Sequence, residues 1–227
     1  MADPWRSRLR RVRRPAPRGL LLRRQPVSRN WGFDRGTPID RHFTERFLAA
    51  ESGRIRGRVL EVKDDEYTRR FGSAVTEAEV LDIDAANPQA TVVADLQSAP
   101  GIPTASYDCI VLTQVLHLVA ELGAAIAECH RILCPGGTLL ATMPSLSRMS
   151  RELYETDHWR VTPVGARKLF GDAFGPDQVV CTGHGNAVLG AAFLMGVAAE
   201  EVRESLLARH DPLFPLVVTV RATKATV

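Results

Sequence analysis

The chain has 227 residues, of which 45% are hydrophobic and 24% are charged, and its formal net charge is +3 at pH 7. This length and composition are those of a globular domain with a sizeable core and some periphery. No segment reaches the roughly 20 apolar residues of a membrane span, and the leucine run at 20–22 is too short for a signal-peptide core. We therefore expect a cytoplasmic protein without a membrane-spanning segment.

The positive charge is concentrated at the N-terminus, where eleven arginines lie in residues 1–35. Residues 1–29 combine arginine clusters with prolines and can bury little apolar surface. Three interpretations are open: a solvated tail, an arm that contacts a polyanion or an anionic substrate, or a targeting sequence. Trp5 is the only stacking group in this tail, so we do not expect nucleic-acid binding.

The four cysteines do not show the spacing of metal ligands, and three of them fall in predicted buried elements. We interpret them as reduced thiols and expect no metal site. They are Cys109, Cys129, Cys134 and Cys181.

The most regular stretch of the sequence runs from 107 to 143. Residues 107–113 form a continuous apolar run rich in β-branched side chains, which is typical of a strand buried on both faces of a parallel sheet. Apolar residues at helical spacing follow between 122 and 133, and a Pro-Gly-Gly sequence at 135–137 ends that helix. Residues 138–143 resume as a second buried strand. The pattern predicts a βαβ unit with a right-handed crossover.

This stretch, YDCIVLTQVLHLVAELGAAIAECHRILCPGGTLLATMP, resembles the second half of the class I S-adenosylmethionine (SAM) dependent methyltransferases, in particular the type 11 group. The resemblance is specific over residues 57–145. It implies a Rossmann-like α/β fold, with a seven-stranded, mostly parallel sheet and helices on both faces, and SAM as cofactor. We therefore divide the chain into an Arg/Pro-rich tail (1–29), an N-terminal lid and helix (30–56) and a SAM-binding methyltransferase domain (57–227).

The turn after the first predicted strand, 58–62, departs from this family. Ligands of open α/β sheets bind at the carboxyl ends of the strands, and the family has an acidic residue there followed by a glycine-rich turn. This chain keeps the acid as Glu61 and the apolar Val62, but Lys63 and Asp65 stand where glycines are expected.

Two outcomes are open for this turn. Either it binds SAM in an altered conformation, with Glu61 ordering the turn and Lys63 near the methionine carboxylate, or cofactor binding is weak or lost. The next segment, Tyr-Thr-Arg-Arg-Phe-Gly at 67–72, is expected to be a short polar helix or loop. It resembles a subgroup of bacterial methyltransferases with a glycine-poor turn, which favours retained binding.

Acidic residues also follow the second and third predicted strands. Asp84 is our candidate for the ribose hydroxyls, because one carboxylate accepts from two vicinal hydroxyls; Asp82 is the alternative if the register is shifted. The resemblance implies that Asp95 accepts from the adenine amino group while the backbone of Leu96 contacts the ring. Asp95 could equally cap the next turn.

Candidate reacting groups follow the fourth strand. Thr113, Gln114 and His117 are expected over the cofactor, and Gln114 can donate and accept hydrogen bonds at once. His117 is a candidate general base, although relatives often carry a histidine here without using it so. His158, in a Trp-Arg-x-Thr-Pro stretch that recurs in the type 11 group, is the preferred base.

Two segments are candidates for binding the acceptor. In the family, the segment ahead of the first strand covers the cofactor, so Arg35, Asp40 and Arg41 are expected to hold substrate or the methionine carboxylate. A purely structural, salt-bridged loop is an equal alternative. Tyr154 and Arg160 are expected at the mouth of the pocket, with Asp157 and His158.

The remaining predicted elements complete the fold. Thr162 is expected to cap a helix with Pro163 in its first turn. Helices are predicted at 42–50, 164–170 and, as one long apolar helix, 186–204, and strands at 78–83, 91–94, 178–182 and 216–222.

The resemblance implies methyl transfer from SAM to an acceptor, for which we expect a hydroxyl of a small molecule or sugar, in natural-product or glycan biosynthesis. The missing glycines motivate a rival hypothesis, a protein of the same fold that no longer methylates and acts as a binding partner or a different enzyme. A nicotinamide dehydrogenase is disfavoured, because no Gly-x-Gly-x-x-Gly follows a strand.

Overall fold

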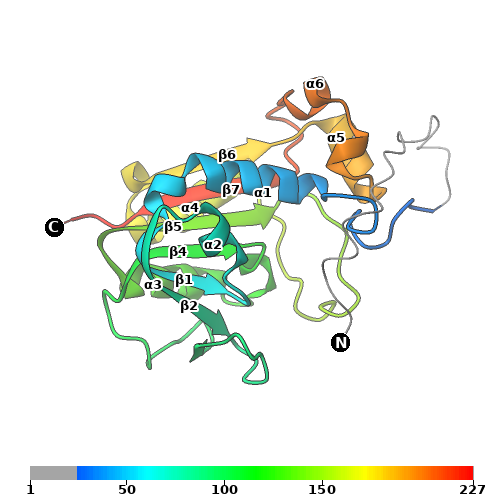
Figure 1. Cartoon of the computed structure of the whole chain (residues 1–227). Helices are drawn as coiled ribbons and strands as arrows, with labels where there is room; N and C mark the ends of the chain where they lie inside the picture. Colours follow the sequence, from blue (N-terminus) through cyan, green and yellow to red (C-terminus); the bar gives the residue numbers. More distant parts are fainter. Residues whose placement is uncertain (1–24, 227) are drawn as a thin grey trace.

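The structure, a computed structural model, describes residues 25–226 and contains one seven-stranded sheet of order β3-β2-β1-β4-β5-β7-β6 (Figure 1). Strand β7 is antiparallel to both of its neighbours, and the other pairs are parallel. This confirms the predicted seven-stranded, mostly parallel sheet. The strands are β1 (Arg56–Val62), β2 (Ala74–Asp82), β3 (Val92–Val93), β4 (Tyr107–Thr113), β5 (Leu133–Pro144), β6 (Val179–His184) and β7 (Val217–Thr223).

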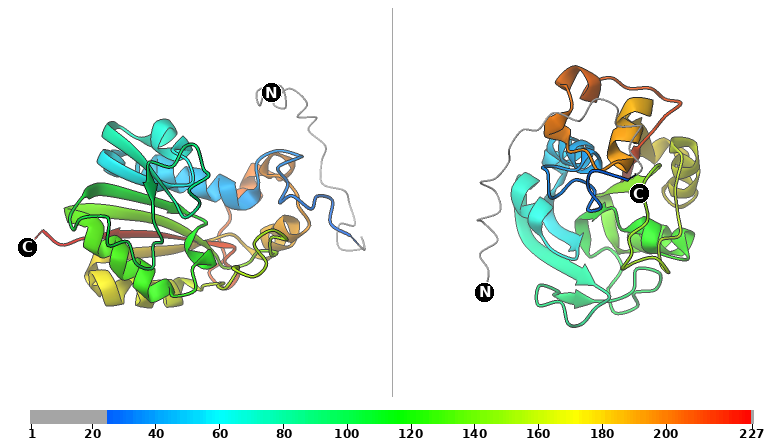
Figure 2. Two further views of the ribbon diagram at one scale, coloured as in Figure 1. Left: turned by 90° about the horizontal axis from the view of Figure 1, so that it is seen from below. Right: turned by 90° about the vertical axis from the view of Figure 1, so that its right-hand side faces the viewer.

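Helices cover both faces of the sheet, as predicted, with α1 on one face and α3 and α4 on the other (Figure 2). The helices are α1 (Ile39–Ala50), α2 (Glu66–Phe71), α3 (Leu122–Ile132), α4 (Pro163–Phe174), α5 (Ala187–Leu194) and α6 (Glu204–Leu207). Single 3₁₀ turns lie at Ser52–Arg54, Leu116–Leu118, Pro176–Gln178 and Ala199–Glu201.

The period of two along the strands divides the core between these layers. In β4, Ile110 packs into the cluster that contains α3 and α4, whereas its neighbour Val111 packs into the cluster beneath Leu48 of α1. Both side chains are fully buried, which is why this strand reads as a continuous apolar run.

Local capping chemistry is also as expected at α4. The Thr162 hydroxyl accepts a hydrogen bond from the Gly165 N–H at 3.1 Å, and Pro163 occupies the first turn. The four cysteines are free thiols, and Cys109, Cys129 and Cys181 are buried, as predicted. No helix within residues 25–226 is long and apolar enough to cross a membrane.

The predicted long helix at 186–204 is wrong. Helix α5 ends at Leu194, and Gly196 then adopts a left-handed φ of 75°. A side chain at 196 would clash with the backbone of Ser28, so only glycine permits this approach. The Val27 N–H donates to the Met195 carbonyl at 2.8 Å, and the segment before α1 thereby packs where the helix would have continued.

Two strand boundaries also differ from prediction. Strand β2 ends at Asp82, so Asp84 lies two residues beyond it. Strand β5 begins at Leu133, which places the Pro-Gly-Gly sequence inside the strand rather than before it. Pairing explains the second difference, because the Gly136 N–H donates to the carbonyl of Lys224, which follows β7, at 2.9 Å.

Candidate functional site

A cavity of about 570 Å³ lies where β1 and β4 end. These two strands are neighbours at the point where the strand order reverses, which is the usual ligand site of an open α/β sheet. Its lining comes from the turns after β1, β4 and β5, from α1 and α2, and from the segment before α1. Four of the candidate site residues, Lys63, Thr113, Gln114 and His117, are among the lining residues.

The turn after β1 adopts a glycine-like conformation without a glycine. Lys63 has a left-handed φ of 77°, which a side chain disfavours. The Lys63 N–H donates to the Leu81 carbonyl at 2.9 Å. The Asn87 amide nitrogen donates both to the Lys63 carbonyl and to the Asp82 carboxylate, each at 2.7 Å. This network holds the turn against β2. The turn therefore keeps a left-handed backbone conformation at position 63 although the residue there is a lysine and not a glycine.

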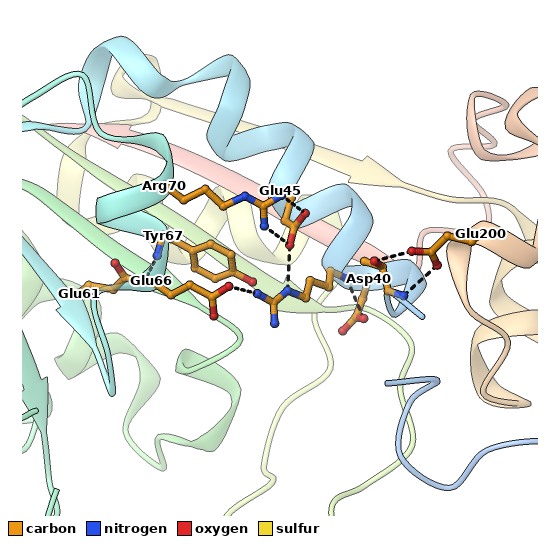
Figure 3. Close-up of polar contacts among 9 residues, drawn as sticks. Asp40, Glu45, Glu61, Glu66, Tyr67, Arg70 and Glu200 are labelled. Atoms are coloured by element: carbon orange, nitrogen blue, oxygen red, sulfur yellow. Dashed lines mark hydrogen bonds and ion pairs between the residues drawn. The ribbon is translucent and has the colours of Figure 1, made fainter. Parts of the chain in front are cut away.

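Glu61 supports the turn through hydrogen bonds to the start of α2. Its carboxylate accepts a hydrogen bond from the N–H group of Tyr67 at 3.1 Å (Figure 3). It accepts a second from the N–H group of Thr68 at 2.7 Å, also in the first turn of α2. The side chain is buried, and burial raises its pKa to about 7. Glu61 therefore supports the site by capping a helix, and it does not line the cavity.

An ion-pair network joins α1 to α2 at the cavity wall (Figure 3). Arg41 pairs with Glu45 at 2.9 Å and with Glu66 at 2.5 Å, and its guanidinium lies 5.4 Å from the centre of the Tyr67 ring. Asp40, one residue earlier, lines the cavity, and burial raises its pKa to about 6. The charge of Arg41 is thus already balanced by carboxylates.

Arg35 lies outside the cavity lining. Its guanidinium makes two hydrogen bonds to the carboxylate of Glu201, in the turn after α5, and the nearby Thr37 bonds to Glu200 (Figure 3). This is the salt-bridged loop that the sequence left open as an alternative.

The two candidate bases have very different surroundings. The side chain of His117 is 14% exposed and lines the cavity, and its Nε2 lies 3.9 Å from the Asp157 carboxylate. Burial lowers the pKa of His117 to about 4, so the imidazole is neutral at pH 7. His158 is exposed and does not line the cavity; its N–H donates to the His117 carbonyl at 3.0 Å.

Tyr154 and Arg160 are not in the lining either. Tyr154 is 61% exposed, and Arg160 binds Asp157 through two hydrogen bonds of 2.5 and 2.8 Å. Arg160 therefore fixes the carboxylate that faces His117.

The strand-end acids lie beside the cavity rather than in its lining. Asp82 ends β2 and is tied to Lys63 through Asn87, whereas the exposed Asp84 accepts from the Ala86 N–H at 2.9 Å. Asp95 accepts from the N–H of Gln97, also at 2.9 Å. Of the two ribose candidates, the shifted-register alternative Asp82 is the one at a strand end.

Four buried polar atoms that line the cavity have no hydrogen-bond partner. They are Thr44 Oγ1, Gln114 Nε2, His117 Nδ1 and Arg148 Nε. Buried polar atoms are nearly always paired, so four such atoms among the lining residues fit a polar ligand such as SAM with its acceptor. Thr44 and Arg148 are not among the site residues predicted from the sequence. Thr44 lies one helical turn after Asp40, which is a weak signal, and nothing in the local pattern marks Arg148. Within the described residues, no group of three or more metal-ligating side chains occurs.

Residues 52–141 match the family profile of a methyltransferase domain. Among solved structures, the chain is similar to an S-adenosylmethionine dependent methyltransferase from Mesorhizobium loti, with 14% identity and a TM-score of 0.53 over 82% of this chain and 98% of that one. A chain of the complex between the Haloferax volcanii Trm112 methyltransferase activator and its proposed methyltransferase matches with 16% identity and a TM-score of 0.51, over 82% and 93%.

A proposed sarcosine dimethylglycine methyltransferase from Galdieria sulphuraria matches with 14% identity and a TM-score of 0.52, over 83% and 91% of the two chains. No curated protein matches the sequence. At these identities the solved structures establish the shared fold alone, and the profile match adds the likeness of residues 52–141 to a methyltransferase domain.

Proposed function

We propose that the chain, with S-adenosylmethionine as cofactor, methylates a hydroxyl of a small molecule or sugar; residues 52–141 match the profile of a methyltransferase domain. The observation that carries the proposal is the cavity at the ends of β1 and β4, whose lining includes four residues with a buried polar atom that lacks a hydrogen-bond partner. Biosynthesis of natural products or glycans is the setting we propose for this activity.

The residues of the turns fit the parts of SAM. Lys63 supplies a cation for the methionine carboxylate, and Asp82 supplies a carboxylate for the ribose hydroxyls, with Asp84 as the alternative. Asp95 and Leu96 are assigned to the adenine, and Thr113 and Gln114 to the floor of the site. When bound, SAM supplies a methyl group on a sulfonium, which reacts by in-line displacement and is accelerated by positioning.

We assign the role of general base to His117 in place of His158. A neutral imidazole inside the cavity can take the proton of the acceptor hydroxyl at Nδ1, the ring atom that is buried without a partner. Asp157, held by Arg160, faces the other ring nitrogen and favours the imidazolium that results. Asp40 and Arg41 remain candidates for contacting the acceptor, because both line the cavity.

Calorimetric titration with SAM and with S-adenosylhomocysteine (SAH) tests the proposal directly. We expect micromolar dissociation constants for both, about −8 kcal/mol, because the turn keeps its geometry and presents Lys63. If neither ligand binds, the fold assignment stands and the chain is a protein of this fold that no longer methylates.

Replacing Lys63 by glycine is expected to stabilise the protein and to weaken SAM binding at once. Glycine adopts the left-handed conformation without steric cost, so the free energy of unfolding should rise by about 1 kcal/mol. Loss of the cation should raise the Kd for SAM about tenfold. Denaturant unfolding and calorimetry measure the two effects.

Lys63→Asn is the matched control, because asparagine tolerates the left-handed region but carries no charge. It should share the loss of SAM affinity with Lys63→Gly. Unchanged SAM affinity in both variants would show that Lys63 does not contact the cofactor.

A further inference from the structure

We propose that the acceptor is a hydroxy acid and that Arg148 binds its carboxylate. The inference rests on the proposed function, since it names the substrate class of the same cavity. Arg148 lies in the loop after β5 and lines the cavity, and neither the profile match nor the predicted site residues include it.

The guanidinium of Arg148 is held in one place by its neighbours. Its centre lies 3.6 Å from the centre of the Trp31 ring, so the indole covers one face. One Nη donates to the Met149 carbonyl at 2.9 Å, and the other donates to the Arg29 carbonyl. These carbonyls use two of the five N–H donors but carry no negative charge.

The remaining donors of Arg148 are suited to a carboxylate. Its Nε is buried and has no hydrogen-bond partner. The Nε–H and a free Nη–H form a planar fork, and this fork matches the two oxygens of a carboxylate. Burial lowers the pKa of the Arg148 guanidinium, because desolvation disfavours the charged form. A bound anion offsets that cost.

Within the described part of the chain, Arg148 is also the cation of the cavity whose charge is neither paired with a carboxylate nor assigned to the cofactor. Three cations line it: Arg41, which is paired with two glutamates; Lys63, which we assign to the methionine carboxylate; and Arg148. Among residues 25–226, no carboxylate lies within ion-pair distance of Arg148. Glu152 acts on it only at longer range, and its carboxylate accepts a hydrogen bond from Ser150 at 2.7 Å.

The walls around Arg148 favour an acceptor with an apolar body. Trp31, Phe33, Leu118 and Leu153 line the same cavity. A hydroxy acid with an aromatic or aliphatic body places its carboxylate on Arg148 and its hydroxyl toward His117, which lines the same cavity. Methyl transfer to that hydroxyl forms an O–CH₃ bond as the S–CH₃ bond of SAM breaks, and the proton passes to His117.

Calorimetry with the full chain saturated with SAH tests this inference. The probes are 4-hydroxybenzoate and 3-hydroxybenzoate, each compared with its neutral amide. We expect each acid to bind at least about tenfold tighter than its amide, because the charged hydrogen bonds are lost with the amide. Arg148→Gln should remove this difference, whereas Arg148→Lys, which keeps the charge without the fork, should keep part of it.

The control is Arg151→Gln, which changes an exposed arginine three residues away that does not line the cavity. It should bind the acids as the wild type does. Equal binding of acids and amides, binding of neither, or an unchanged preference in Arg148→Gln overturns the inference. A loss of SAH affinity in Arg148→Gln also overturns the inference, because it would show that Arg148 binds the cofactor and not the acceptor. If the wild type fails to bind SAH, the proposed function fails, and the acid–amide comparison without SAH still decides whether Arg148 binds carboxylates.

Discussion

Replacing His117 by asparagine is expected to lower kcat/KM for methyl transfer by about 10²- to 10⁴-fold, the usual contribution of a general base. The affinity for SAH should stay within about twofold, because the imidazole acts on the acceptor proton rather than on the cofactor. The measurement is the rate of SAH formation with an acceptor that the wild type methylates, beside calorimetry with SAH. Asparagine is the chosen replacement because it approximates the size of the imidazole ring and can form hydrogen bonds, but it cannot accept the proton of the acceptor.

His158→Asn separates the two histidines. His158 is adjacent in space but exposed, and it contacts His117 only through the backbone. Its variant should retain nearly full activity. If His158→Asn loses the activity and His117→Asn keeps it, our base assignment is reversed.

The pH dependence of the methyl-transfer rate tests the same assignment of His117 as the base. The pKa of His117 is lowered to about 4, so its basic form persists well below the range of an ordinary histidine. The rate should therefore fall only as the pH drops toward 4. A lowered histidine pKa also costs stability as pH falls from about 6.5 toward 4, because the unfolded chain binds the proton first. His117→Asn should lack this part of the pH dependence.

The largest expected effect on stability belongs to Glu61→Ala. The change leaves the N–H groups of Tyr67 and Thr68 without their acceptor, and it removes a buried side chain beneath the cavity turn. We expect the free energy of unfolding to fall by about 2–4 kcal/mol, as for a lost helix cap combined with a buried unsatisfied donor. Denaturant unfolding measures it, and the affinity for SAM should fall because the turn that carries Lys63 loses its support.

Two further variants control this experiment. Glu66→Ala changes an acid in the first turn of α2. The Glu66 side chain is about half exposed and pairs with Arg41 at the surface, so its loss should lower the free energy of unfolding by no more than about 1 kcal/mol. Glu61→Gln keeps one acceptor and should cost less than alanine. A cost for Glu61→Ala as small as that for Glu66→Ala would show that the cap contributes little.

The pH profile identifies the carboxyl group itself. Burial raises the pKa of Glu61 to about 7, above the usual value near 4.5, so the folded protein holds this proton more tightly than the unfolded chain. Its contribution to stability is complete below about 4.5 and is lost as the pH rises through 7. Because glutamine does not titrate, the stability advantage of the wild type over Glu61→Gln should shrink over this pH range.

Local patterns in the sequence predicted the βαβ unit at 107–143, and the resemblance to the methyltransferase family implied the seven-stranded sheet around it. The apolar run at 107–113, the stripe that forms α3 and the Thr162 cap each reflect contacts or conformations within a few residues of the chain, so they can be read without the fold. The right-handed crossover rule then orders neighbouring strands, and ligand sites lie at strand ends in such sheets. This reasoning predicted Lys63, Gln114 and His117 near the strand ends, and all three line the cavity.

Only the tertiary structure decided which other groups share the cavity. Whether His117 or His158 faces inward depends on how the loop after β5 folds back onto the turn after β4, and Arg148 is placed by Trp31, far away in the chain. The helix predicted at 186–204 ends early because Gly196 packs on Ser28. Periodicity and capping describe each segment by itself, whereas these outcomes depend on contacts between segments that are far apart in the sequence, and such contacts exist only once the chain has packed.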